Sequence, residues 1–164
     1  MSILVMALWL VSSACAHLLA SSGLVLLGLL AWSWLEYALH RFVLHGLPPF
    51  AAWHQLHHQR PRALICAPTL FSGGLIGLLV FAPALLLSGL WQACALTLGV
   101  LLGYLAYSWI HHLAHHGHVD ARWLRRRQHW HALHHRRAAA EQRACYGVST
   151  AFWDHVFGTL PRRP

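Results

Sequence analysis

Long apolar segments dominate this 164-residue chain and restrict the environment in which it can fold. They run over residues 3–19, 24–44, 70–88 and 91–111, and each is close to the roughly 20 residues of a helix that crosses a bilayer. Charged residues make up only 10% of the chain, whereas a soluble domain carries about a quarter. The sequence therefore predicts an all-α integral membrane protein with about four transmembrane helices.

Two short, uncharged segments separate these spans in pairs. Ser21-Ser22-Gly23 lies between the first two spans, and Ser88-Gly89 lies between the last two. Both segments are too short for anything but tight turns between antiparallel helices. We therefore expect two helical hairpins.

The remaining polar segments, 45–69 and 112–164, complete what we interpret as a single domain over residues 1–164. Residues 112–143 are rich in helix formers and 147–158 are typical of irregular structure, so we expect a largely helical cap. The arginines lie in segments next to histidine clusters, at the ends opposite to the two turns. The positive-inside rule then places the cap and both termini in the cytoplasm.

The net charge of +8 does not indicate a nucleic acid partner. A basic soluble protein would suggest one, but here the arginines follow the ends of apolar spans and the histidine clusters. The basic residues are all arginine, and the chain is rich in leucine and alanine. This usage suggests a bacterial protein, and hence the inner membrane.

The chain has 16 histidines, and their spacing carries more information than their number. Twelve of them form four clusters in the segments HRFVLH, WHQLHH, HHLAHH and HALHH. On a helix, HxxHH and HxxxH spacing places imidazoles one turn apart on one side, where they can chelate a metal. The clustered residues are His40, His45, His54, His57, His58, His111, His112, His115, His116, His131, His134 and His135.

The first cluster leaves two interpretations open. His40 and His45 would point about 140° apart on a straight α-helix, so they either serve different metals or the helix loosens before Gly46 and the prolines that follow. His17, His118 and His155 stand alone in the sequence, and we expect them to be bystanders.

Neutral imidazole is a good ligand for iron, zinc or copper, and about ten candidate ligands suit two metal ions. Carboxylate-bridged di-iron bundles need several Glu residues. The four acids of this chain are Glu36, Asp120, Glu141 and Asp154. A dinuclear site here must therefore consist essentially of histidine.

The segments EYALHRFVLH, WHQLHH, HHLAHH, HALHH and YGVSTAFWDHVFGT resemble, in this order, the motifs of the fatty acid hydroxylase and sterol desaturase superfamily. The resemblance covers roughly residues 36–160. It implies that the metal ligands are His40, His45, His54, His57, His58, His111, His115, His131, His134 and His135. The HX3H motif fits His111 with His115 when Tyr107 is aligned with the family's tyrosine, but His112 with His116 has the same spacing.

Three further residues are candidates for support of the ligands. Glu36 lies one turn before His40 and could accept an imidazole proton, or it could pair with Arg41. Asp154 could orient a ligand or a loop, or cap a turn. Tyr107 enters through the resemblance alone.

By this resemblance the protein binds two iron ions, with zinc as the metal that could replace them after purification. It would use O2 and electrons from a separate ferredoxin or cytochrome, because the sequence has no fused donor domain, to hydroxylate a lipid drawn from the bilayer. HRFVLH and WDHVFGT favour a fatty acyl chain, near the 2-hydroxylase branch. The enzymatic alternatives are a carotenoid or sterol hydroxylase or desaturase. A non-enzymatic metal-binding or transport protein is another, although transport needs polar groups within the spans.

Overall fold

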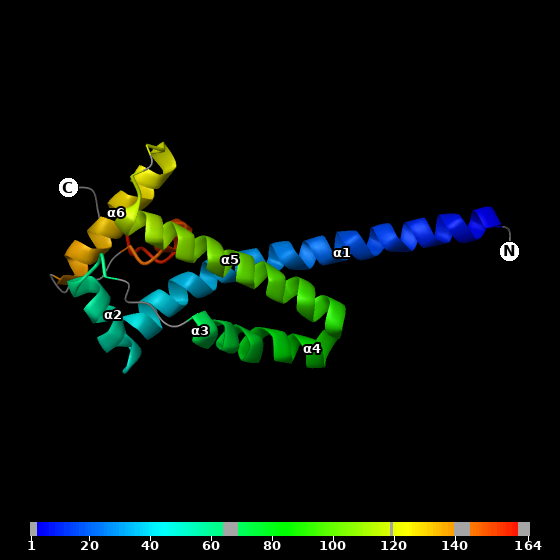
Figure 1. Cartoon of the computed structure of the whole chain (residues 1–164), viewed down its shortest axis with the longest axis horizontal. Coiled ribbons are helices and arrows are strands. Elements are labelled where there is room, and N and C mark those ends of the chain that lie inside the picture. The colour runs from blue at the N-terminus through cyan, green and yellow to red at the C-terminus, as the bar shows by residue number, and fades with distance from the viewer. Residues whose placement is uncertain (1–2, 64–68, 119, 140–144, 161–164) are drawn as a thin grey trace. The chain divides into compact units, whose positions relative to one another are not determined.

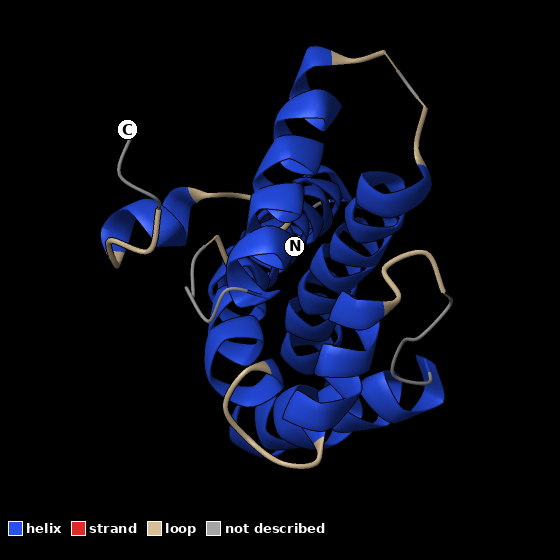
Figure 2. Ribbon diagram, turned by 90° about the vertical axis from the view of Figure 1, so that its left-hand side faces the viewer, coloured by secondary structure: helices blue, strands red, loops and turns tan. Residues whose placement is uncertain are grey.

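Helices make up the regular elements of this protein. The computed structural model describes residues 3–63, 69–118, 120–139 and 145–160, and these residues contain no β-strand (Figure 2). The all-α prediction is confirmed. In chain order (Figure 1) the elements are α1 (Ile3–Ala38), the π-helix η1 (Leu39–Leu44), α2 (Phe50–Gln59), α3 (Thr69–Ile76), the π-helix η2 (Gly77–Phe81), α4 (Ala82–Ser88), α5 (Leu90–His116), α6 (Arg122–Ala139) and α7 (Phe152–Val156).

Three helical segments within the described ranges are long and apolar enough to cross a membrane. They are Ala16–Leu44, Phe71–Ser88 and Leu90–His116. Their lengths of 29, 18 and 27 residues match the roughly 20 residues that a bilayer requires. The prediction of a helical membrane protein is confirmed, but the described residues hold three candidate spans where the sequence suggested about four.

The difference arises at Ser21-Ser22-Gly23, where the predicted turn is wrong. α1 continues through these residues without a break. Serine and glycine weaken a helix interior by at most about 1 kcal/mol each, and a break inside a bilayer would leave backbone groups without partners. The prediction that both termini lie on one side depended on this turn and loses its basis, because the two ends of one helix lie apart.

The second predicted turn, at Ser88-Gly89, is confirmed. α4 ends at Ser88 and α5 begins at Leu90, and Gly89 between them has a φ of +96°. Glycine adopts this conformation without the clash that a Cβ would cause. The chain therefore folds back into an antiparallel hairpin of α4 and α5 (Figure 1).

The helices divide into two compact units, and the division falls within α1 and α5. The first unit comprises Met1–Ala31 and Thr69–Leu102. Within it, α1 and α5 cross at two glycines: a Cβ on Gly28 would lie 2.3 Å from the Leu96 carbonyl oxygen, and one on Gly99 would lie 2.1 Å from that of Val25. The two backbones are therefore in direct contact, as at helix crossings built on small residues in membranes.

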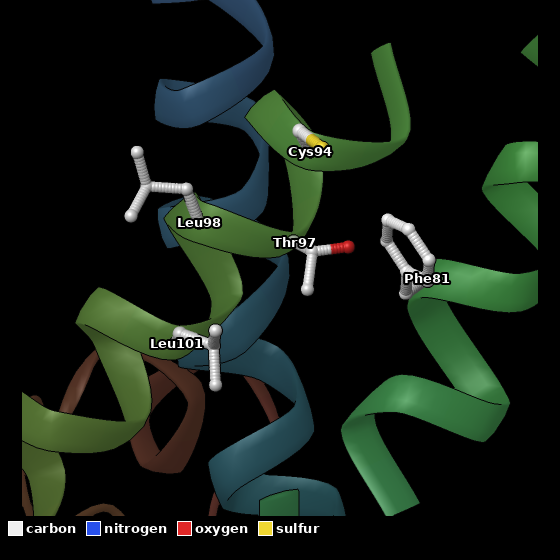
Figure 3. Close-up of a pocket in the computed structure, with 5 residues that line it drawn as sticks. All are labelled: Phe81, Cys94, Thr97, Leu98 and Leu101. Atoms are coloured by element: carbon white, nitrogen blue, oxygen red, sulfur yellow. The ribbon is translucent and has the colours of Figure 1, made fainter. Parts of the chain in front are cut away.

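An apolar groove of about 390 Å³ also belongs to the first unit (Figure 3). It is lined by Phe81, Cys94, Thr97, Leu98 and Leu101. The Thr97 hydroxyl is buried, and no hydrogen-bond partner for it occurs in the described part of the chain. The groove suits a hydrocarbon chain better than a polar ligand, because its lining is almost entirely apolar.

The second unit comprises Trp32–Pro68 and Gly103–Pro164 and holds all four histidine clusters. Its most deeply buried side chains include Tyr37, His134, Tyr146 and Asp154, so polar and aromatic groups form much of its interior. The short helix α7 lies in the segment 147–158 that was predicted to be irregular. Its five residues are too few to show a helical repeat in the sequence.

Candidate metal centre

A π-helix brings the first two clustered histidines to the same side. In η1 the backbone bonds run between residues five apart, so His40 and His45 lie nearly above one another, and their ring centroids are 5.2 Å apart. The helix ends at Leu44, just before Gly46. Of the two interpretations that the sequence left open, the loosened helix is the one observed, and both histidines join one group.

The first histidine group collects side chains from η1, α2 and α6, and it consists of His40, His45, His54, His58 and His134. Their Nε2 atoms converge. Those of His40 and His58 each lie 3.0 Å from that of His54, and that of His134 lies 3.1 Å from His45 and 3.2 Å from His58. The group could hold one metal ion.

The second group collects side chains from α2, α5 and α6, and it consists of His57, His115, His131 and His135. The Nε2 atom of His115 lies 3.1 Å from that of His57 and 2.7 Å from that of His131, and His131 and His135 are 3.1 Å apart. His111 lies beside the group, with its ring centroid 4.8 Å from His57 and 4.7 Å from His131.

Each HxxHH motif serves both groups. In α2, His54 and His58 are one turn apart and join the first group, while His57 points to the second. In α6 the division is reversed, because His131 and His135 join the second group and His134 joins the first. The three imidazoles of a motif therefore do not converge on one metal as the spacing alone suggested. The groups are adjacent, with the ring centroids of His58 and His135 4.2 Å apart.

The spacing of the nitrogen atoms fits metal ligands. Two imidazole nitrogens about 2.1 Å from one ion are about 3.0 Å apart when their bonds meet at a right angle, and about 3.4 Å apart at the tetrahedral angle. Seven neighbouring Nε2 pairs lie at 2.7–3.2 Å, and all ligand atoms of a group lie within 4.8 Å of one another. The first group offers five imidazoles, one more than a tetrahedral zinc site uses.

The electrostatics of the groups also suits ligands. Burial, followed by the charge of His134, lowers the pKa of His58 to about 2. Burial, followed by the charges of His115 and His57, lowers the pKa of His135 to about 3. Burial likewise lowers the pKa of His131 well below its usual value. These imidazoles are neutral at pH 7, which is the form that binds metal.

The two registers that the sequence allowed for the HX3H motif are placed differently. His111 and His115 face the second group, whereas His112 and His116 stack on each other with ring centroids 4.7 Å apart and belong to neither group. Tyr107 stacks on His111 at 5.7 Å. The predicted bystanders His17, His118 and His155 are exposed and also lie outside both groups.

The loop 145–150 contacts the first group through the backbone carbonyl and the ring of Tyr146. The Nδ1 atom of His40 donates a hydrogen bond to the Tyr146 carbonyl, at 2.5 Å. Because a carbonyl can only accept, Nδ1 carries the proton and Nε2 is left with its lone pair. The Tyr146 ring packs against His40, His45 and His134, with centroids 5.6–5.7 Å away.

Two buried carboxylates hold this loop. Asp154 accepts from the backbone N–H groups of Tyr146 and Gly147, both at 2.8 Å. Glu36 accepts from the backbone N–H groups of Val148 at 2.7 Å and Ser149 at 2.8 Å, and also from the Ser149 hydroxyl. The four consecutive amides 146–149 are thus bound by the two acids.

Both roles considered for Glu36 are replaced by this one. Glu36 contacts the loop and not an imidazole, because the Nδ1 proton of His40 goes to the Tyr146 carbonyl. Arg41 donates to the Tyr37 hydroxyl at 2.7 Å, in place of the predicted alternative of an ion pair with Glu36. Asp154 does orient a loop, which was one of its predicted roles.

Sequence reasoning missed Tyr146, Ser149 and Thr159 as parts of the site. Thr159 donates to Asp154 at 2.6 Å and lies 3.2 Å from the Tyr37 hydroxyl. All three occur in the segment YGVSTAFWDHVFGT, so the signal was present. Each of the three has a partner more than 100 residues away, and spacing rules cannot find such contacts.

Comparisons with known proteins place the chain among related sequences. A model of the fatty acid hydroxylase family matches residues 25–159. A dihydroceramide fatty acyl 2-hydroxylase of Arabidopsis thaliana is 33% identical over 159 residues, covering 84% of this chain and 60% of the relative. The fatty acid 2-hydroxylase of Homo sapiens is 32% identical over 158 residues, covering 87% of this chain and 41% of the relative.

A solved structure is similar as well. Full-length scs7p, in which only the hydroxylase domain is visible, matches with a TM-score of 0.68 and 26% sequence identity over 95% of this chain and 65% of that one.

The fold and the site define a class: helical membrane proteins with two adjacent polyhistidine groups that could each hold a metal ion. Because the family model covers most of its length, the chain belongs to the fatty acid hydroxylase family. It spans 60% of the length of the plant relative and 41% of the human one.

Proposed function

We propose that this protein is a membrane-bound di-iron oxygenase that hydroxylates a C–H bond of a fatty acyl chain. The observation that supports this most strongly is the pair of adjacent histidine groups, in each of which the ligand nitrogens lie within 4.8 Å of one another and neighbouring Nε2 atoms are 2.7–3.2 Å apart. The first iron would bind the five imidazoles of the first group, and the second would bind the four of the second group. His111, whose ring contacts three members of the second group, is a fifth candidate ligand there.

The bound irons would supply the oxidation, in which O2, two electrons from a ferredoxin or cytochrome and two protons from water give one hydroxyl group on carbon and one molecule of water. The residues of the chain have other tasks. The neutral imidazoles keep their lone pairs available, and the Tyr146 carbonyl holds the proton of His40 on Nδ1. No side chain needs to act as a general base.

The substrate class follows from the membrane setting and from the relatives. Those relatives are named fatty acid 2-hydroxylase and dihydroceramide fatty acyl 2-hydroxylase. We therefore infer that carbon 2 of a fatty acyl chain is the site of attack. The apolar groove in the first unit gives such a chain a suitable surface.

We further propose that the cap lies in the cytoplasm of a bacterial cell, at the inner membrane. The arginines of the segments 60–62 and 122–136 support this orientation through the positive-inside rule. A ferredoxin or cytochrome in the cytoplasm could then reach the cap. With α1 as a single span, the end of α1 at Ile3 would lie on the other side of the membrane.

The experiment that tests this function is a lipid analysis of cells that express the protein with oxygen supplied. His134→Ala with His135→Ala removes one ligand from each group, whereas His112→Ala with His116→Ala removes the two neighbouring imidazoles that belong to neither. We expect wild type and the second variant to produce fatty acyl chains heavier by one oxygen at carbon 2, and the first variant to produce none.

The outcome also separates the alternatives. Loss of two hydrogens instead of gain of an oxygen would indicate a desaturase, and oxidation of a carotenoid or sterol would change the substrate class. If iron-loaded protein with a reduced ferredoxin and O2 leaves all lipids unchanged, the proposed oxygenase function is wrong.

A further inference from the structure

The hydrogen bond between His40 and the loop belongs to a longer chain of contacts. The carbonyl of Tyr146 and the N–H of Gly147 are the two ends of one peptide group, which is planar. Its carbonyl accepts from His40 at 2.5 Å, and its N–H donates to Oδ2 of Asp154 at 2.8 Å. The direction of the N–H therefore determines the direction of the carbonyl, and Asp154 controls both.

The surroundings hold this peptide in place. Oδ1 of Asp154 accepts from the Tyr146 N–H at 2.8 Å, so one carboxylate binds two successive amides. A Cβ on Gly147 would lie 1.9 Å from the Thr150 carbonyl oxygen and 2.8 Å from Asp154, so only glycine allows the carboxylate to approach. Asp154 is fully buried, and His40 is 2% exposed. Water cannot replace these contacts at low cost.

The contacts reach the two histidine groups unequally. His40 belongs to the first group. Its Nδ1 proton is accepted by the Tyr146 carbonyl, and the carboxylate of Asp154 at the other end of the same peptide strengthens this hydrogen bond. Buried Nδ1 atoms without a hydrogen-bond partner among the described residues belong to His57, His131 and His135 of the second group and, in the first group, to His58. The carboxylate thus acts on one of two adjacent metal sites.

We propose that Asp154 is a positioning residue that acts through the Tyr146–Gly147 peptide to fix the tautomer and orientation of His40, and so sets the metal affinity of the first histidine group alone. Glu36 assists by holding the next two amides of the loop. This inference rests on the metal-binding part of the proposed function and does not depend on lipid oxidation.

The test measures the number of iron ions bound to the full-length chain. Protein purified in detergent is loaded with Fe(II) without oxygen and then dialysed against increasing concentrations of a chelator. Removing an indirect partner of a metal ligand lowers affinity by about 10–100-fold. We expect Asp154→Asn to lose one iron at a 10–100-fold lower chelator concentration than wild type, and to retain the other as wild type does.

Asp120→Asn is the matched control, because Asp120 is an exposed acid paired with Arg125. It should behave as wild type. The site that loses iron is identified by double variants: Asp154→Asn should cause no further loss in His134→Ala, but should cause further loss in His115→Ala, because only the second pair affects different metals.

The proposal is overturned if Asp154→Asn keeps both irons up to the wild-type chelator concentration. It is also overturned if both irons leave in parallel while the helix content falls, since that result shows a general structural role. If wild type binds two irons and Asp154→Asn loses one, but wild type oxidises no lipid, the proposed function fails and this inference stands.

Discussion

The crossing of α1 and α5 at Gly28 and Gly99 allows a quantitative test of the fold. In Gly99→Ala, the new Cβ would lie 2.1 Å from the Val25 carbonyl oxygen and 2.9 Å from the Cα atom of Gly28, whereas ordinary contacts begin at 3.4 Å. Both neighbours are backbone atoms and cannot rotate away. The helices must therefore separate by on the order of 1 Å, which we expect to cost about 1–3 kcal/mol, as overpacking does elsewhere.

Gly23→Ala is the matched control, because Gly23 lies in the middle of α1 and a Cβ there has no atom within 4 Å. Alanine is a better helix former than glycine by about 1 kcal/mol, so this variant should gain stability. The two substitutions should differ by about 2–4 kcal/mol in the free energy of unfolding. The assay is an unfolding titration in mixed detergent micelles, followed by circular dichroism. Gly99→Ala with wild-type or higher stability would show that the two backbones do not touch.

Three further predictions concern the metal centre. His115→Ala should lose one iron per chain and His116→Ala none, as counted by mass spectrometry of the metal; equal losses would contradict the placement of His116 outside both groups. Burial lowers the pKa of His131 in the folded protein, so below about pH 6.5 only the unfolded chain takes up this proton. Metal-free protein should therefore lose stability as the pH falls below about 6.5, by up to about 1.4 kcal/mol per pH unit for such a histidine. A pH-independent melting temperature between pH 7 and 5 would refute this. Removal of iron by a chelator should lower the free energy of unfolding by the amount that mass action requires, about 2.7 kcal/mol for iron at 100 times the dissociation constant, and the melting temperature should fall with it. An unchanged melting temperature would mean that the ions do not bind the folded histidine groups.

The sequence was most informative where local spacing determines the structure. The apolar segments predicted membrane helices, and the Ser88-Gly89 turn was correct because Gly89 adopts a positive φ that favours glycine. Ser21-Ser22-Gly23 has a similar composition, yet α1 passes through it. Composition alone cannot separate these cases, since a helix tolerates one glycine when its backbone bonds have no better partner.

The histidine clusters illustrate the same limit within the site. Their spacing predicted chelating side chains, but the division of each HxxHH motif between two groups depends on how α2, α5 and α6 pack in the second unit. The role of Glu36 was beyond local reasoning as well, because its partners Val148 and Ser149 are more than 110 residues away. Contacts of this kind follow from tertiary packing and not from periodicity.

The π-helix η1 also has a consequence for how this protein can change during evolution. Its extra residue per turn aligns His40 with His45, which are separated by four residues. If one of these four were deleted, the two histidines would be four residues apart and would share one face only after the segment returned to α-helical winding. A deletion without that change of winding would turn His54 and His58 in α2 away from His40. Substitutions at Phe42, which is 58% exposed, leave the winding intact. Selection at this segment should therefore couple the number of residues to the winding of the helix, and act far more weakly on the identity of exposed residues.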